Sequence, residues 1–446
     1  MTKRLLRAHM WTATLLVTSL TLLLPAAVHA QDDAGPPPLP DTSKTAKIDK
    51  YDNLFQGQFT PGSGFDIIRS EIGSLNISFY GLFRYINQTP AVQTNIDHLG
   101  RARPIDTRND LNWHRTMVWL TGWFYDPKFR YNITCWSLAS TEQTLLFGNM
   151  RYLMSERMTF GVGVGPNLTS RSLQGSWPYW AASDRQMGEE FLRGGFSSAF
   201  WITGKARRGM YYTASVNRSI SQLGNTTADD NRDMAYSASV WAHPTTGEFG
   251  PRGGFGDLEH HKHLATQFGM SAGTSREGRY APIDQTSKAT QIRLSDGVLP
   301  FETGALAESV TVNKLTYRAV SFDAGAKYKG FSFQGEYTYR ELSHFDANGP
   351  LPLSTIIDHG FFAEAMHMVV PKKLGIYAVG SYVFDEFDRQ PFEYGGGANF
   401  YPYGRRNWRL NLHVLHVDRS PTGSSFGYYT PGLTGTIFSL GTDVLL

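Results

Sequence analysis

Residues 408–417 alternate between apolar and polar side chains with a period of two. The two phases are Trp408, Leu410, Leu412 and Val414 against Arg409, Asn411 and His413. Such alternation predicts a β-strand with one dry face and one wet face. The chain must therefore form a sheet whose apolar side is covered by a protein core or by lipid.

The same alternation runs through most of the chain. Sixteen segments fit a strand, namely one from residue 73, one at 115–125, one from residue 129, and others near 142–152, 158–164, 196–204, 209–219, 234–242, 264–273, 316–327, 331–341, 359–370, 374–384, 393–401, 408–417 and 434–446. Open, strongly twisted sheets rarely exceed about ten strands. The number of segments therefore favours a closed barrel over a soluble β-sandwich.

The connections between these segments are of two kinds. The short ones are 126–128, 153–157, 205–208, 328–330, 371–373 and 402–407, with 243–263 as an exception, and the longer ones include 87–114, 165–195, 274–315 and 418–433. Outer-membrane barrels have short periplasmic turns, long external loops and an even number of strands. The sequence predicts an all-β fold, a transmembrane antiparallel barrel of about sixteen strands.

Aromatic side chains near the strand ends indicate that the dry face meets lipid. Examples are Trp123 and Tyr125, Tyr337 and Tyr339, Tyr401 and Tyr403, and Trp408. Girdles of this kind mark the two interfaces of a membrane barrel. Residues 438–446 also alternate to the last position, as in terminal strands of outer-membrane proteins, although Leu446 stands where Phe or Tyr is usual. We expect a location in the bacterial cell outer membrane, with its lipid as a partner and no nucleic acid.

The first residues have the features of an export signal. A basic start, an apolar run and an Ala-Val-His-Ala end predict a signal peptide at 1–30. A Pro-rich flexible leader at 31–64 and the barrel at 65–446 would follow. The whole chain has 42 basic and 39 acidic residues, so removing Lys3, Arg4 and Arg7 leaves equal numbers. Cys135 is the single cysteine, which excludes an internal disulfide.

Two stretches resemble the phosphate-selective (O/P-type) porin family of bacterial outer-membrane channels. Residues 160–204, which include "WPYWAASDRQMGEEFLRGG", resemble its fifth strand, long third loop and next strand. Residues 395–417, "GGGANFYPYGRRNWRLNLHVLHV", resemble its penultimate hairpin. The resemblance implies a sixteen-stranded, trimeric channel that passes small anions. It assigns no binding residue.

Five cations on the polar phase of their strands are candidate pore-lining residues. They are Arg84, Arg130, Lys327, Arg340 and Arg409. Arginine suits phosphate because its planar fork offers two donors, and anion channels need cations on inward positions. The same side chains could instead solvate a wide pore beside Asp323, Glu336 and Asp443. We therefore expect a passive channel for small hydrophilic solutes, favouring anions such as phosphate, with a general, weakly selective porin as the alternative.

Loop 165–195 is the candidate constriction. It holds Arg171, Arg185 and Arg193 together with Trp177, Tyr179 and Trp180 and several acids. Folded inward, it would narrow the pore, whereas folded outward it would be an external lid or a contact in a trimer. The sequence leaves both arrangements open.

Other motifs predict no further chemistry. The tract His260-His261-Lys262-His263 fits a solvated turn better than a metal site, and Gly161-Val-Gly-Val-Gly165 lacks the βαβ context of a nucleotide fingerprint. We expect no metal, no cofactor and no enzyme activity. An adhesin that uses its loops remains an alternative, as does an enzyme on the barrel wall, for which His413 and Ser439 are the available pair.

Overall fold

A computed structural model describes residues 62–138, 143–171, 178–220, 233–249, 256–279, 292–423 and 427–446. All of them belong to the unit formed by residues 48–446. The expected signal peptide and nearly all of the expected leader lie outside the described residues and stay predictions. Within the described ranges, no helix has the length and hydropathy needed to span a bilayer.

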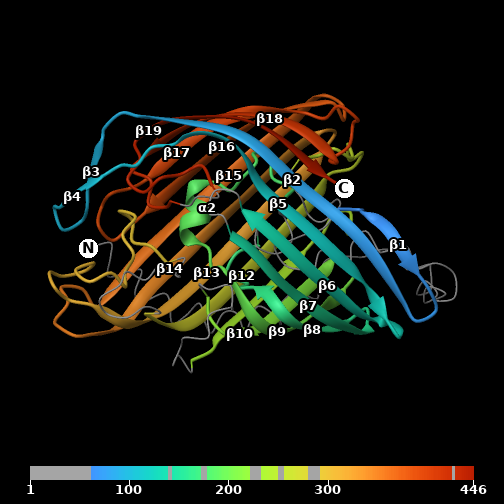
Figure 1. The fold of residues 1–446 in the computed structure, drawn as a ribbon, viewed down its shortest axis with the longest axis horizontal. Helices are drawn as coiled ribbons and strands as arrows, with labels where there is room; N and C mark the ends of the chain where they lie inside the picture. Colours follow the sequence, from blue (N-terminus) through green and yellow to red (C-terminus); the bar gives the residue numbers. More distant parts are fainter. Residues whose placement is uncertain are drawn as a thin grey trace. The chain divides into compact units, whose positions relative to one another are not determined.

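The described strands form a closed antiparallel barrel (Figure 1). Its sixteen strands, in chain order, are β2 (Gly73–Pro90), β5 (Asn109–Phe124), β6 (Asp126–Leu138), β7 (Gln143–Ser155), β8 (Met158–Pro166), β9 (Phe196–Arg207), β10 (Met210–Asn217), β11 (Ala235–Ala242), β12 (Ala265–Gly278), β13 (Val312–Tyr328), β14 (Phe331–Ala347), β15 (Thr355–Val370), β16 (Leu374–Phe384), β17 (Phe392–Phe400), β18 (Trp408–Asp418) and β19 (Gly435–Leu445). Each pairs with the next in sequence, and β19 pairs with β2 to close the ring. The predicted fold class is confirmed.

Strand β1 (Phe65–Arg69) extends the seam of the barrel. The pairing of β19 with β2 runs from Gly435 and Pro90 to Leu445 and Tyr80. Beyond that point β1 pairs with β2 between residues 74 and 77. The edge of β2 is therefore covered along almost its whole length, which removes an unpaired edge that hydrocarbon would not tolerate. The sequence pattern did not predict this strand.

The two faces of the wall follow the expected alternation. In β18 the apolar Leu410, Leu412 and Val414 are 39–44% exposed on the outer side, whereas Arg409 and His413 are at most 2% exposed on the inner side. In β2 the buried phase holds the polar Asn76, Ser78 and Arg84, together with Tyr80, Leu82 and Ile86. The prediction of a dry outer face and a polar inner face is confirmed, because the apolar phase is the one left without protein cover.

The strand ends differ from the expected ones mainly on the side of the long loops. Six strands extend four to six residues beyond the alternating pattern on that side, namely β2, β5, β12, β13, β14 and β15. A small hairpin of β3 (Thr94–Ile96) and β4 (Ala102–Pro104) also projects from the first long loop. The alternation weakens at these ends because water replaces lipid outside, so backbone pairing continues where the hydropathy pattern has stopped.

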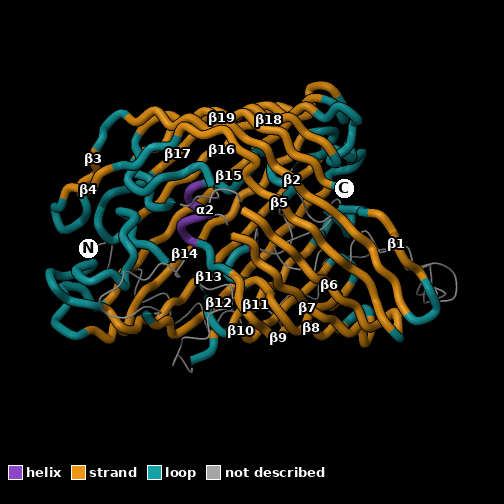
Figure 2. Tube along the Cα trace, viewed as in Figure 1, coloured by secondary structure: helices purple, strands orange, loops and turns teal. Residues whose placement is uncertain are grey.

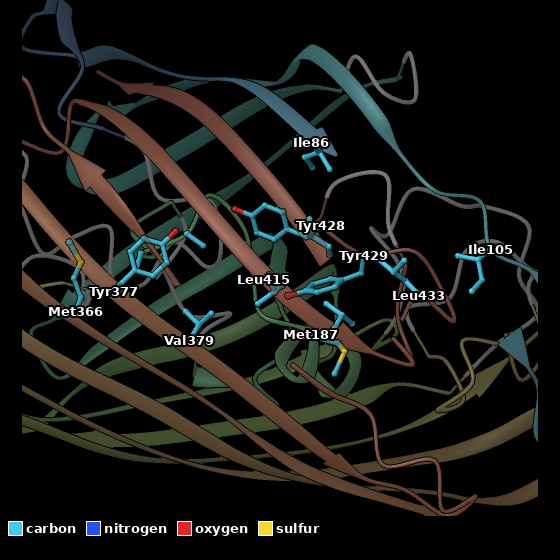
Figure 3. Packing of buried hydrophobic residues seen from close by; sticks show 14 of the residues in the cluster. Ile86, Ile105, Met187, Met366, Tyr377, Val379, Leu415, Tyr428, Tyr429 and Leu433 are labelled. Atoms are coloured by element: carbon cyan, nitrogen blue, oxygen red, sulfur yellow. The ribbon is translucent and has the colours of Figure 1, made fainter. Parts of the chain in front are cut away.

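The loop after β8 is described at residues 167–171 and 178–195, which fold into the barrel and are called the inner loop below, whereas Trp177 lies outside the described residues. The inner loop carries the short helix α2 (Met187–Leu192), and Figure 2 shows this helix enclosed by the strands. Inside the barrel, an apolar cluster joins Met187 of α2 to Val379 and Leu415 of the wall, and to Tyr428 and Tyr429 (Figure 3). The two tyrosines belong to the described residues 419–423 and 427–434, called the C-terminal loop below. Two loops therefore meet in the lumen.

Candidate functional site

One arc of the inner wall is basic. The arc consists of β18, β19, β2, β5, β6 and β7, which are neighbours in the sheet. Its inward, buried charged side chains in the described residues include four arginines, Arg84, Arg115, Arg151 and Arg409, against one acid, Asp443. Arg409 and Asp443 form a close ion pair, with 2.6 Å between Nη2 and Oδ2. The remaining arginines leave this side of the lumen positively charged.

The opposite arc of the wall is acidic. It runs from β12 to β17. Its inward, buried charged side chains, among the described residues, are Glu277, Asp323, Glu336, Asp358, Glu364 and Glu393 against Lys327 and Arg340. The nearest opposite-charge pair is Arg340 with Asp358, 2.6 Å apart. The lumen therefore has a basic side and an acidic side.

The inner loop offers acceptors to the basic arc. Asp184 Oδ2 lies 3.0 Å from Nη1 of Arg84 and 3.4 Å from Nη2 of Arg115. The main-chain oxygens of Trp180 and Ala181 accept hydrogen bonds of 2.6 and 3.0 Å from Nη1 of Arg409. Guanidinium groups carry only donors, so a carboxylate and free carbonyls are their proper partners. These bonds fix one edge of the loop to the basic arc.

The same loop offers donors to the acidic arc. The main-chain N–H of Met187 donates to Glu393 Oε1 over 2.7 Å, and that of Ala181 to Glu364 Oε1 over 3.3 Å. The N–H of Arg171 donates to Glu336 Oε2 over 3.1 Å. A carboxyl oxygen is the acceptor in each of these bonds. The loop is thus held between the basic and the acidic arc by the carboxylate of Asp184 and by hydrogen bonds of its backbone.

Charged side chains of the inner loop also pair with one another. Nη2 and Nε of Arg193 donate hydrogen bonds of 2.7 and 2.8 Å to the two carboxylate oxygens of Glu190. Arg185 forms an ion pair with Glu189, 2.7 Å between Nε and Oε1, and lies over the ring of Trp180 at 4.4 Å. The candidates Arg185 and Arg193 therefore lie within the lumen, each beside a carboxylate of the same loop. The structure places the loop inward, not outward as an external lid.

The C-terminal loop closes over the inner loop from the external side. The hydroxyl of Tyr429 donates to Glu393 Oε2 over 2.7 Å. The carbonyl of Gly427 accepts hydrogen bonds from Arg84 and Arg108 over 3.1 and 3.0 Å. Tyr428 lies with its ring centroid 5.0 Å from the guanidinium carbon of Arg84. This second loop therefore contacts both arcs of the wall.

Salt bridges link the loops at the external end. Asp97, in the β3–β4 hairpin, pairs with Arg101 and Arg103 at 2.8 and 2.9 Å. Burial raises the pKa of Asp97, but hydrogen bonds from Arg103 and Arg101 outweigh it and lower the pKa to about 2. His98 Nδ1 lies 2.6 Å from Oδ2 of Asp296, in the loop between β12 and β13. The contact between His98 and Asp296 connects two long loops at the mouth.

At the opposite end, on the side of the short turns, a long connection joins β11 to β12, and the structure describes its residues 243–249 and 256–264. Phe249 is buried, and its ring centroid lies 4.7 Å from Nζ of Lys327. His261 contacts Asp257 through Nδ1 and lies 3.1 Å from Glu248 through Nε2. Asp257, Glu259 and His261 could together offer three ligand atoms to a metal ion. Both ring nitrogens of His261 already have carboxylate partners, so a structural ion pair explains this cluster.

The five cations proposed to line the pore have different surroundings. Arg84, Lys327, Arg340 and Arg409 lie inside the barrel with at most 1% exposure. Arg130 lies near the short-turn end, half-buried, and donates to the carbonyl of Pro127 over 3.2 Å. Arg84, Arg340 and Arg409 each have a carboxylate within 3.0 Å. Their inward position follows the predicted phase, and their role toward anions stays a prediction.

The pair His413 and Ser439 bears on the enzyme alternative. The two residues lie directly opposite each other on β18 and β19. Nδ1 of His413 contacts the hydroxyl of Tyr377 at 3.0 Å, and in the described part of the chain Oγ of Ser439 has no hydrogen-bond partner. A nucleophile and its base need a hydrogen bond, and the base needs an orienting group. The position of His413 opposite Ser439 does not by itself provide these hydrogen bonds.

The glycines of the motif at 161–165 serve packing. A Cβ on Gly161 would lie 2.0 Å from the indole of Trp201, and one on Gly165 would lie 3.3 Å from the same ring. Gly163 has φ of +129° and lies against the backbone of Gly148 and Asn149. The three glycines therefore let β8 fit closely beside Trp201 and β7, which accounts for the pattern without a nucleotide.

Several residues of the interior were not named from the sequence. Arg151, Glu364 and Glu393 sit on the polar phase of segments that had been predicted as strands, so the alternation contained the signal. Tyr428 and Tyr429 lie in a long loop, where no period indicates direction. For those two the sequence held no usable signal.

Comparison of this barrel with solved structures identifies its class. It is similar to in-vitro folded OmpT, an outer membrane protein of Vibrio cholerae, at 12% identity and a TM-score of 0.54, covering 85% of this chain and 99% of that chain. The trimer form of that protein gives 12% identity and a TM-score of 0.53 over 84% and 99% of the two chains. At this identity the likeness shows the fold. The chain is a porin-like β-barrel of the bacterial outer membrane.

A more particular assignment does not follow from these comparisons. An anion-selective porin from Comamonas acidovorans aligns at 12% identity over 83% of this chain and 99% of that one, with a TM-score of 0.47. No protein-family model matches the sequence, and a search of curated proteins finds no match. The resemblance to the phosphate-selective family therefore stays a prediction, and the porin-like barrel is what the comparisons support.

Proposed function

We propose that the chain is a porin, a passive diffusion channel for small hydrophilic solutes across the bacterial outer membrane. The observation that carries the proposal is the inner loop held across a polar barrel between a basic and an acidic arc. A sixteen-stranded barrel is wide enough for an aqueous channel unless something narrows it. The loop supplies the narrowing, and its hydrogen bonds to both arcs hold it in place.

The charges inside the barrel favour weak selectivity. Arg84, Arg340 and Arg409, which were expected to attract anions, lie beside Asp184, Asp358 and Asp443. An arginine that already binds a carboxylate offers less of its charge to a passing anion, because the pair is nearly neutral at a distance. We therefore favour a general porin over a phosphate channel, and propose a small residual anion preference on the basic side.

Conductance measurements test this function. The refolded protein would be inserted into a planar bilayer, and the reversal potential recorded under a KCl gradient before inorganic phosphate is titrated. We expect open channels, a reversal potential near zero or slightly on the chloride side, and no block by phosphate. Strong chloride selectivity with phosphate block would instead support the anion channel. The absence of conductance from folded protein would overturn the porin proposal.

We also propose a homotrimer. The support is the trimer form of the structurally similar Vibrio cholerae protein together with the resemblance at residues 160–204. Size-exclusion chromatography with light scattering on detergent-solubilised protein measures the assembly directly. A mass of three chains is the expected result, and a stable single-chain mass would contradict it.

A further inference from the structure

Exposed cations occupy the short turns at one end of the barrel. Six connections at this end carry at least one of them in the described residues, with Lys128, Arg157, Arg208, Lys329, Lys372 and Arg405 as representatives. None of the six forms an ion pair with the described part of the chain. The seventh connection adds the exposed Lys262. Exposed acids lie at the same end, Asp126, Glu156 and Glu259 among them, but the exposed cations outnumber them, so the periplasmic rim carries a net positive charge.

The external end differs, because several of its cations have acidic partners. Arg101 and Arg103 pair with Asp97, and Lys314 lies 3.6 Å from Asp233. Arg318 pairs with Glu341 at 3.1 Å. These partners neutralise much of the positive charge at the long loops. The two ends therefore differ in how many of their cations form ion pairs, and the turn end has more positive charge without an acidic partner.

Aromatic rings accompany the cations of the turns. Tyr125, next to the turn that holds Lys128, is 84% exposed, and Tyr403, two residues before Arg405, is 68% exposed. Nζ of Lys329 lies 4.9 Å from the ring centroid of Tyr328. Exposed tyrosine rings belong at the boundary between acyl chains and headgroups. A cation that lies next to such a ring, on the side away from the acyl chains, is therefore at the level of the lipid phosphates.

We propose that this basic rim binds the anionic headgroups of phospholipids in the periplasmic leaflet. The cations recur on successive turns around the barrel and do not gather on one side. A ring-shaped arrangement matches the annulus of lipid that surrounds a barrel, whereas a protein partner would need a single patch. Each lysine or arginine near a bilayer surface attracts anionic lipid independently. The rim thereby fixes the depth of the barrel in the membrane.

Spin-labelled lipids measure this preference. The protein is reconstituted in phosphatidylcholine, and the association of labelled phosphatidylglycerol is compared with that of labelled phosphatidylcholine by electron spin resonance. We expect phosphatidylglycerol to be favoured roughly two- to five-fold at low salt. The preference falls toward one at high salt, because salt screens exposed charges.

Two matched variants locate the effect. The turn-end variant K329Q/K372Q/R405Q removes three exposed cations, and the loop-end variant R101Q/K314Q/R419Q removes three cations at the long loops. Gel mobility with and without heating confirms that both are folded. We expect the preference to fall in the turn-end variant and to persist in the loop-end variant.

Two outcomes overturn the proposal. One is a ratio near one for the unaltered protein at low salt, and the other is an equal loss in both variants. If the lipid ratio is near one while soluble anionic cell-wall fragments bind the protein, the rim is a docking surface for a periplasmic polymer, and the lipid proposal is wrong. The test needs no ion conductance, so its result is independent of channel activity.

Discussion

Ser183 and Tyr428 join the two loops inside the barrel. The hydroxyl groups of the two residues lie 2.7 Å apart, and the main-chain N–H of Ser183 donates to the tyrosine oxygen over 2.9 Å. Both residues are buried. Because Ser183 precedes Asp184, the residue that faces Arg84 and Arg115, this contact links the C-terminal loop to the charge pairing of the basic arc.

Replacing Tyr428 by phenylalanine should loosen this link. The change leaves the buried N–H of Ser183 without its acceptor, and such a loss costs about 1–3 kcal/mol. We expect easier urea unfolding and faster proteolysis within residues 419–434. Tyr403→Phe, at an exposed turn, is the matched control and should leave both unchanged. Equal behaviour of the two variants would show that the Ser183 contact contributes nothing.

Asp184→Asn should change both stability and selectivity. It removes the carboxylate shared by Arg84 and Arg115, and breaking a buried ion pair costs about 3–5 kcal/mol. It also adds one positive charge to the lumen, so the reversal potential under a KCl gradient should move toward the chloride side. Asp126→Asn, at an exposed turn, is the control. Unchanged stability together with an unchanged reversal potential would contradict this account of the inner loop.

The turn around His261 should loosen as the pH rises. The hydrogen bond with Asp257 raises the pKa of His261, burial opposes this, and the charges of Asp257 and Glu248 add to it. A raised pKa means that the protonated imidazole stabilises the fold below about pH 6.5, the value for an unfolded histidine. This stability is lost as the pH passes the higher folded-state pKa.

Trypsin cleavage after Lys262 reports on this turn. The rate at pH 6 and pH 9, normalised to a small peptide substrate, should rise with pH in the unaltered protein. The His261→Gln variant should be cleaved rapidly at both pH values. A normalised rate that does not depend on pH in the unaltered protein would exclude the pairing with Asp257 as a stabilising contact.

Gly163→Ala should destabilise the barrel near β8. A Cβ at this position would lie 2.3 Å from the carbonyl oxygen of Gly148, and φ of +129° is unfavourable for alanine. Strain of this kind costs about 1–3 kcal/mol. Gly380→Ala is the matched control, because the nearest atom to its Cβ lies 3.4 Å away. The midpoint of urea unfolding should fall only in the first variant.

The alternation of side chains predicted the wall of the barrel well. Lipid on one side and polar groups on the other act on every residue of a strand, so Arg84 and Arg409 could be assigned to the lumen from their phase alone. At the external loops the predicted strands were too short, because the side chains alternate only where one face of the strand meets lipid. The short strand β1 was missed because its isoleucines are adjacent and do not alternate.

The arrangement inside the lumen was less accessible. The composition of residues 165–195 indicated a constriction loop but left its direction open, because either arrangement satisfies the same residue types. Its inward position depends on partners such as Glu393 on β17 and Arg409 on β18, which are more than 190 residues away along the chain. The pairing of Arg340 with Asp358 depends on strand register, which period-two patterns do not define.

The seam at β2 sets an order for assembly. Tyr80 pairs with Leu445, so the contact that seals the ring joins segments from opposite ends of the barrel sequence. Closing so long a loop is slow compared with forming the hairpins between neighbouring strands. Until β19 arrives, β2 presents an open edge on which other chains could pair. A barrel closed in this way therefore needs protection during its insertion, and we expect the rate of sealing to limit the yield of folded protein.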